Sequence, residues 1–142
     1  MTSRREFIKG MVGASAAVCC GLGVTSILES CATTNHLQVP ITGTRIEIDS
    51  ALFLEKNYVV ITNSQLPAPI YILKNGDSYQ ASLMLCTHKQ CELNITGATL
   101  TCPCHGAEFS AKGTLLQGPA ETDLQNFTVS VENNKIIIDL KK

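Results

Sequence analysis

Residues 86–106 read CTHKQCELNITGATLTCPCHG, and the fold and chemistry expected of this chain both follow from this stretch. It contains two boxes, Cys86 to Cys91 and Cys102 to Gly106, and each box offers two thiols and one imidazole. Both boxes come at the ends of runs that resemble strands, so we expect them on loops of a β-rich domain. Thiolates and imidazoles are ligands for zinc and for iron–sulfur centres, so the boxes predict a metal or redox site.

Several kinds of site use these residue types. A structural zinc site would take two Cys and two His, but C-x-H followed by C-x-x-H lacks the usual zinc-finger spacing and leaves two cysteines over. A cysteine nucleophile with a His base needs only one residue of each type. Two disulfides would leave both histidines without a role, although export from the cytoplasm permits disulfides. A fourth interpretation, a metal cluster with mixed thiolate and imidazole ligands, accounts for all six residues through a family resemblance.

The two boxes, C-T-H-x-x-C and C-P-C-H-G, resemble those of the Rieske family, whose 2Fe-2S cluster has two Cys on one iron and two His on the other. The resemblance implies that this chain binds one such cluster. The four ligands that it implies are Cys86, His88, Cys102 and His105. It also implies a disulfide between Cys91 and Cys104 that joins the two loops. Cysteine arithmetic agrees, because the four cysteines after the N-terminal region divide into two ligands and one bridge.

Residues around the implied cluster bear on its reduction potential, which spans about −150 to +300 mV in Rieske centres. Many family members have Ser directly after C-x-x-H-G and Tyr two positions later, where this chain has Ala107 and Phe109. Neither side chain donates a hydrogen bond, so we expect a low or intermediate potential. Pro119 matches the family's proline-containing loop that covers the cluster. Gln90 stands where the first box often has Gly.

The rest of the chain predicts an all-β domain. Short alternating or β-branched runs predict strands, and turn signals such as Asn75-Gly76 and Asn133-Asn134 separate them. These runs are residues 45–48, 58–62, 70–73, 79–85, 127–131 and 136–138. Short strands at this spacing are typical of a sandwich or barrel. From about Ile41 to Leu140, the resemblance implies a Rieske-type antiparallel β-sandwich with a small inserted cluster-binding subdomain.

The N-terminal residues 1–31 predict a targeting segment. Residues 3–9, SRREFIK, resemble the twin-arginine export signal, and nineteen uncharged residues follow them. The segment could end in either of two ways. It could be processed as a lipoprotein with Cys31 acylated, which we favour, or remain as an uncleaved span of about 28 Å. Because the basic residues stay on the cytoplasmic side, both place the domain on the outer face of the inner membrane.

Composition limits the remaining possibilities. The chain has 142 residues and a formal net charge of −1, which gives no electrostatic footprint for nucleic acid. Its length suits one small domain, which we place at residues 44–142. Residues 32–43 are polar and contain Pro40 and Gly43, so we expect a tether there, with His36 solvated.

A single redox centre that carries one electron, in a chain without a substrate-pocket signature, indicates an electron carrier or a subunit of an oxidoreductase. The resemblance implies the iron–sulfur subunit of a quinol-oxidising cytochrome bc-type complex, with quinol bound to His88 or His105 and a tethered head that delivers the electron to a cytochrome. A second possibility is a small subunit of another extracytoplasmic oxidoreductase, of the arsenite oxidase kind. A structural zinc protein is a third. Cytoplasmic Rieske ferredoxins share the ligands but typically lack the disulfide cysteines and the export signal.

Overall fold

The computed structural model describes residues 35–141, so the expected signal, its anchor and Cys31 lie outside the described residues. The described part forms eleven strands and one short 3-10 helix, η1 (Ser50–Phe53), and contains no helix long and apolar enough to cross a membrane. The strands are β1 (His36–Gln38), β2 (Arg45–Asp49), β3 (Tyr58–Thr62), β4 (Ile70–Asn75), β5 (Ser78–Leu83), β6 (Asn94–Thr96), β7 (Thr99–Thr101), β8 (Glu108–Ser110), β9 (Leu115–Gln117), β10 (Asn126–Glu132) and β11 (Lys135–Asp139).

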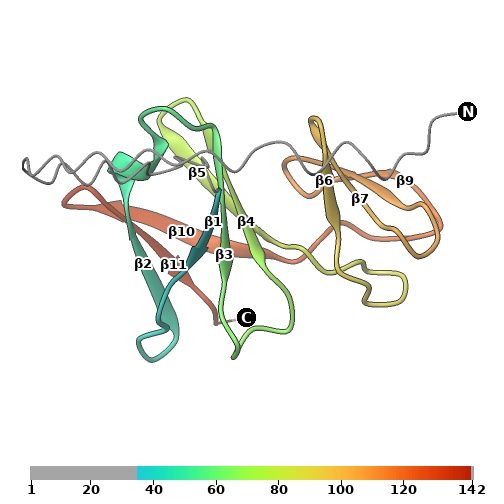
Figure 1. Cartoon of the computed structure of the whole chain (residues 1–142), viewed down its shortest axis with the longest axis horizontal. Helices are drawn as coiled ribbons and strands as arrows, with labels where there is room; N and C mark the ends of the chain where they lie inside the picture. Colours follow the sequence, from blue (N-terminus) through green and yellow to red (C-terminus); the bar gives the residue numbers. More distant parts are fainter. Residues whose placement is uncertain (1–34, 142) are drawn as a thin grey trace, which may run out of the picture. The chain divides into compact units, whose positions relative to one another are not determined.

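Seven strands form the larger sheet, in the order β1-β3-β4-β5-β10-β11-β2 (Figure 1). All neighbours in it are antiparallel except β1 and β3, which are parallel. The sheet curls around one apolar core, because strands from both of its ends contribute to the same cluster. The fully buried members of this core include Ile46 of β2, Ile61 of β3, Ile72 of β4 and Ile138 of β11. Period-two alternation on β2 places Ile46 and Ile48 inward and the charged residues of that strand outward.

The smaller sheet has the order β6-β7-β8-β9 and is inserted between β5 and β10, which pair with each other in the larger sheet. Figure 1 shows β6, β7 and β9 together, beyond the ends of the long strands. A second apolar cluster lies beneath this sheet, and it includes Leu100, Phe109, Cys86 and Cys102. The predicted all-β sandwich with an inserted subdomain is therefore confirmed, and the two boxes belong to the insert.

The segment expected to be a tether, residues 32–43, is partly a strand. Within it, β1 pairs with β3, and the N–H of Val60 donates to the carbonyl of Asn35 at 2.7 Å. A three-residue strand has too little alternation to be recognised, and this one forms because β3 offers it a ladder. His36 is exposed, as expected.

A glycine lies where the inserted subdomain meets the larger sheet. Gly113, in the turn between β8 and β9, has φ of 81°, and a Cβ built on it would lie 2.9 Å from Oγ of Ser82 and 3.2 Å from Oδ1 of Asn126. The Ser82 hydroxyl is buried and donates to that Asn126 oxygen at 2.6 Å. The turn can therefore approach β5 and β10 only where no side chain intervenes.

Replacing Gly113 with alanine should lower the free energy of unfolding by about 2–3 kcal/mol, since the methyl group meets a fixed polar pair and the backbone is left-handed. Gly76→Ala is the matched control, because Gly76 has φ of 62° and nothing within 4 Å of its Cβ position. That control should lose only about 1 kcal/mol. Urea unfolding followed by circular dichroism measures both variants, and equal losses would contradict the close approach.

Candidate metal centre

Two loops of the insert present the boxes, and backbone hydrogen bonds close both loops in the same way. The first loop follows β5 and the second joins β7 to β8. In each, the N–H of the fifth residue donates to the carbonyl of the first cysteine, whose own N–H donates to the carbonyl of the sixth residue. These bonds measure 2.8–3.0 Å and join Cys86 with Gln90 and Cys91, and Cys102 with Gly106 and Ala107. The two boxes therefore have one backbone design used twice.

The fifth residue of each loop has a left-handed backbone conformation: φ is 56° at Gln90 and 77° at Gly106. Only glycine adopts this conformation without a steric cost. The departure from the family pattern at position 90 therefore leaves the turn intact, although the glutamine makes the turn less stable than a glycine would.

Gln90→Gly should raise the free energy of unfolding by about 0.5–1 kcal/mol, because relief of the left-handed strain exceeds the added flexibility of the unfolded chain. Gly106→Ala is the reverse test in the second loop, where nothing lies within 4 Å of the Cβ position. It should lower the free energy by about 1 kcal/mol through backbone strain alone. Thermal unfolding midpoints that move in the same direction for both variants would be inconsistent with this account.

The thiols of Cys86 and Cys102 face inward and lie close enough to interact. Their residues are 1% and 3% exposed, and both belong to the apolar cluster under the small sheet. Burial raises the pKa of the Cys86 thiol, and the backbone N–H groups of His88 and Lys89 only partly offset this. Burial also opposes ionisation of Cys102, but hydrogen bonds from backbone N–H groups and from the Cys86 thiol outweigh it and lower the pKa of Cys102.

The backbone donors to the Cys102 sulfur are the N–H groups of Cys104 and His105. The backbone N–H groups of His88 and Lys89 likewise act to lower the pKa of Cys86. Such donors stabilise thiolates and the negative charge of sulfur bound to metal. The loops therefore favour metal-bound thiolates although the site is apolar.

The two imidazoles lie together on the outer side of the loops. The ring centroids of His88 and His105 are 4.9 Å apart, with the rings nearly perpendicular. His105 is exposed and His88 half-buried. Nδ1 of His88 is buried without any hydrogen-bond partner, the one such side-chain atom found in residues 35–141. A buried nitrogen without a partner is costly, and a metal bound to it would remove that cost.

A disulfide between Cys91 and Cys104 connects the two loops, as the resemblance implied. It leaves Cys86 and Cys102 as the free cysteines of the described residues. The disulfide sulfurs and that of Cys102 lie within 4.8 Å of one another, the one close group of three potential metal-ligating residues in this part of the chain. Bridged sulfurs offer no thiolate, so this group cannot be a three-sulfur metal site.

The donors suit a centre with two metals better than one zinc ion. In a tetrahedral zinc site, bonds of about 2.0–2.3 Å bring all ligand atoms within roughly 4 Å of one another. In residues 35–141, the one group of donor atoms that lie within 4.8 Å of one another consists of three sulfurs and includes neither His88 nor His105. Two inner sulfurs and two outer nitrogens fit a binuclear group with one metal on each side.

The residues expected around the cluster divide into two kinds. Ala107 and Phe109 are fully buried and belong to the same apolar cluster as the two thiols, so no hydroxyl comes from these positions. Pro119 is exposed and follows a cis peptide bond. Its segment is tied to the first loop by Thr87, whose hydroxyl donates to the carbonyl of Thr122 at 2.8 Å. The sequence interpretation did not include Thr87, since a threonine between two ligands carries no signal of its partner.

Comparisons with known proteins agree with this geometry. Residues 35–128 match the family model of the Rieske [2Fe-2S] domain. The cytochrome b6-f complex iron–sulfur subunit of Chlorobaculum tepidum is 30% identical over 73 residues, which cover 50% of this chain and 40% of that protein. The same subunit of Synechococcus sp. strain WH7803 is 35% identical over 75 residues, covering 49% and 42%.

A solved structure extends the likeness to the fold. The plasma membrane Rieske protein PetC3 of the cyanobacterium Synechocystis PCC 6803 aligns with a TM-score of 0.54 and 30% identity, covering 64% of this chain and 94% of that one. The chain spans about two fifths of the length of the curated relatives it matches, so that likeness concerns the domain. The predicted 2Fe-2S cofactor is confirmed and the structural zinc interpretation is wrong. The chain belongs to the Rieske family, and its domain transfers electrons through a Rieske 2Fe-2S cluster.

Proposed function

We propose that Cys86, Cys102, His88 and His105 hold the cluster, and that the chain serves as the iron–sulfur subunit of a quinol-oxidising cytochrome complex. The observation that carries the ligand assignment is the separation of the donors: two free thiols inside the apolar core and two imidazoles outside it, on loops joined by a disulfide. When bound, the 2Fe-2S group takes up and releases one electron at a time. The thiol pair anchors it in the apolar interior, and the imidazole pair presents it to solvent.

The histidines give this centre a place where a proton can accompany the electron. Nδ1 of His88 is the inner nitrogen and would face the metal, which leaves Nε2 to hold or release a proton. His105 is the more exposed ring and would meet a quinol hydroxyl or a partner protein first. A ring that accepts a quinol proton while the electron enters at the same edge couples both transfers without a separate base.

The names of the relatives support assembly into a larger complex. Both curated relatives described above are iron–sulfur subunits of cytochrome b6-f complexes. Quinol as donor and a cytochrome subunit as partner follow from that likeness. If the proposal holds, the full chain purified gently from membranes has haem absorbance bound to it, and after dithionite reduction it gives a Rieske electron paramagnetic resonance signal. A Rieske signal without bound haem would contradict membership of a cytochrome complex and would indicate a separate electron carrier.

Attachment to the outer face of the cytoplasmic membrane belongs to the same proposal. Its support is residues 3–9 and Cys31, which lie outside the described residues. Labelling cells with a fatty acid, with Cys31→Ala as the control, tests the lipid anchor. If the wild-type chain is unlabelled but still sediments with membranes, the anchor is the uncleaved N-terminal span and not an acylated cysteine.

The lack of a hydroxyl at positions 107 and 109 predicts the reduction potential of the cluster. We expect Ala107→Ser combined with Phe109→Tyr to raise it by roughly 60 mV for each new donor, because a hydrogen bond that favours the reduced form tenfold shifts a one-electron couple by that amount. The wild-type value should lie in the lower or middle part of the range of about −150 to +300 mV. Protein-film voltammetry compares the two proteins. A wild-type potential near the upper limit would contradict the expectation.

A further inference from the structure

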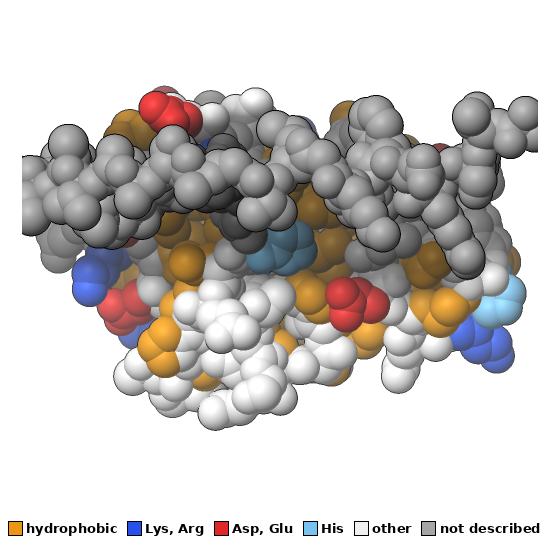
Figure 2. Space-filling view, in the orientation of Figure 1, with side chains coloured by type: hydrophobic (Ala, Val, Ile, Leu, Met, Phe, Trp, Pro, Cys, Tyr) orange, Lys and Arg blue, Asp and Glu red, His pale blue; other side chains and the backbone are white. Residues whose placement is uncertain are grey.

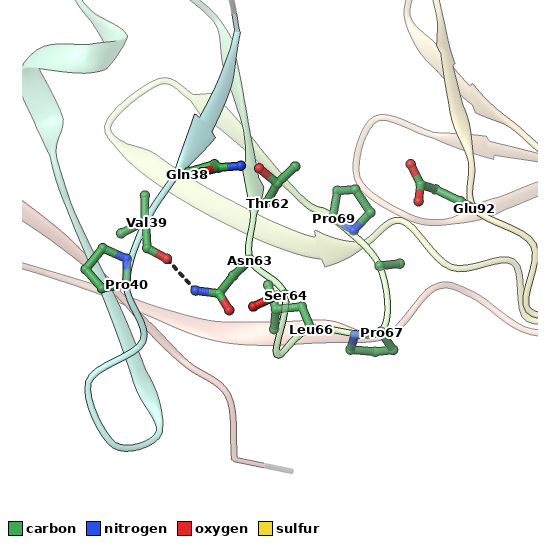
Figure 3. Close-up of a pocket in the computed structure, with 11 residues that line it drawn as sticks. Gln38, Val39, Pro40, Thr62, Asn63, Ser64, Leu66, Pro67, Pro69 and Glu92 are labelled. Atoms are coloured by element: carbon green, nitrogen blue, oxygen red, sulfur yellow. Dashed lines mark hydrogen bonds between the residues drawn. The ribbon is translucent and has the colours of Figure 1, made fainter.

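Two neighbouring cavities lie along the edge of the larger sheet, and no proposed cluster ligand lines either of them. Their volumes are about 670 and 610 Å³, and Pro69 and Glu92 line both. One side is formed by β1 and by the loop between β3 and β4, and the other by the segment that follows the first metal-binding loop. Figure 3 shows Gln38 and Asn63 on the first side and Glu92 on the second. We call the two cavities together the edge groove.

The edge groove runs beside an open sheet edge. β1 is the terminal strand of the seven-stranded order, with β3 as its one neighbour among residues 35–141. In the parallel register, backbone groups alternate between the two sides of a strand, and Asn35 already bonds to β3. The N–H and C=O groups of His36 and Gln38 therefore lie on the open side. Such groups can pair with an extended chain that adds a strand.

The walls of the groove are preformed. The side-chain amide of Asn63 donates to the carbonyl of Val39 at 2.7 Å, which ties the loop after β3 to the end of β1 (Figure 3). The same side chain accepts from the N–H of Gln65 at 2.8 Å. Pro67 and Pro69 restrict the backbone of the loop further. An incoming segment would meet a surface that needs little ordering, which reduces the entropic cost of binding.

Charge distinguishes one kind of occupant. Among the described residues, Glu92 is the one formally charged residue that lines either cavity. In the face shown in Figure 2, the visible surface is largely uncharged, with scattered acidic and basic side chains. A lone carboxylate in a mostly neutral groove favours a cationic group on the occupant, and it discriminates against an acidic one.

We propose that the edge groove binds an extended polypeptide segment of a partner subunit, which pairs with β1 and places a Lys or Arg side chain opposite Glu92. The proposal rests on the proposed function, in which the domain belongs to a larger complex. It adds that the domain has two separate surfaces for two tasks: the edge groove for holding the partner segment, and the histidine-bearing loops for electron exchange. Neither His88 nor His105 lines either cavity, so a segment that fills the groove does not have to cover them.

The groove is nevertheless connected to the metal-binding loops. Glu92 directly follows Cys91 of the disulfide, and it forms a β-bridge with Leu85, which directly precedes Cys86. A segment bound at Glu92 would therefore stabilise the first loop at both of its ends. Attachment and the rigidity of the cluster site would rise together.

A photo-crosslinking residue in place of Gln38, in the full chain made in its native host, tests the proposal. The expected product joins this position to another protein, at a peptide with Lys or Arg within three residues of the link. Glu92→Lys should reduce the yield about fivefold or more, because it turns one attraction worth up to about 1 kcal/mol into a repulsion. His36→Pro, which removes an N–H of the open edge, should reduce it as well. The same crosslinker at Ser130, exposed on β10, is the control and should not give this product.

Every other result overturns the proposal. A link to residues 1–34 of the same chain would make the groove a seat for the N-terminal segment, and a link to a second copy would make it a self-association surface. No product above the Ser130 control, or a product unaffected by both substitutions, would also overturn it. The paramagnetic resonance signal is recorded on the same membranes. A normal signal with bound haem but without a crosslink refutes only the proposal that the groove binds a partner segment. A missing signal refutes the proposed function.

Discussion

His105→Ala should abolish the Rieske signal, whereas His36→Ala should leave it at full intensity. The two histidines are both exposed, but His36 lies on β1 and His105 lies 4.9 Å, centroid to centroid, from His88. Removing one nitrogen ligand leaves the outer iron with an open position, and a cluster with an incomplete ligand set is readily lost. Electron paramagnetic resonance at equal protein concentration, with iron and sulfide analysis, measures the loss.

Substitution of the inner ligands supplies the second half of this test. Cys86→Ser and Cys102→Ser should each remove the cluster just as completely, because an alcohol is a far poorer ligand for iron than a thiolate. Circular dichroism of every variant shows whether the sheets still form. A Cys102→Ser protein that retains full iron and the wild-type signal would refute the ligand assignment, since Cys102 and Cys86 are the free thiols in residues 35–141.

Removing the disulfide should have the next largest effect. The double variant Cys91→Ser/Cys104→Ser opens a link across 13 positions of sequence, and a loop of this length corresponds to about 3 kcal/mol of unfolding free energy. The double substitution is preferable to either single one, because a remaining free thiol would lie within 4.8 Å of Cys102 and could form a wrong bridge.

The cluster should be lost faster from the double variant than from the wild type on warming, because the loops are then held together only by the metal and by local hydrogen bonds. The decay of visible absorbance at a fixed temperature measures this. Equal decay rates in the double variant and the wild type would show that the bridge does not brace the site.

The metal centre was predictable because its ligands are short-range signals. Each box holds its thiols and imidazole within six residues, which indicated a metal or redox site but left its kind open. The family resemblance then implied Cys86, His88, Cys102 and His105 as the ligands. The strands of the larger sheet were also predictable, because β-branched runs such as residues 58–62 and 136–138 alternate or are apolar throughout. The disulfide came from the family resemblance and not from the residues themselves.

The family resemblance implied an inserted subdomain, but residue patterns predicted neither its individual strands nor the open edge of the larger sheet. β6, β7, β8 and β9 have three residues each, too few for a periodic pattern, and they form because they pair with one another over a shared core. The role of Gly113 depends on Ser82 and Asn126, which are distant in sequence. The edge groove likewise depends on Glu92 lying near β1, which only the folded chain brings about.

The two separate apolar cores described above also imply a division of labour during maturation. Cys86 and Cys102 belong to one core, to which the larger sheet contributes Val60 of β3 and Tyr71 of β4, and no proposed ligand belongs to the other. The main core of the seven-stranded sheet can therefore form before any iron arrives. The insert, which lacks two of its interior partners until then, would open locally while its host stays closed. Iron can therefore enter a chain whose larger sheet is already folded, with β1 in place at its edge.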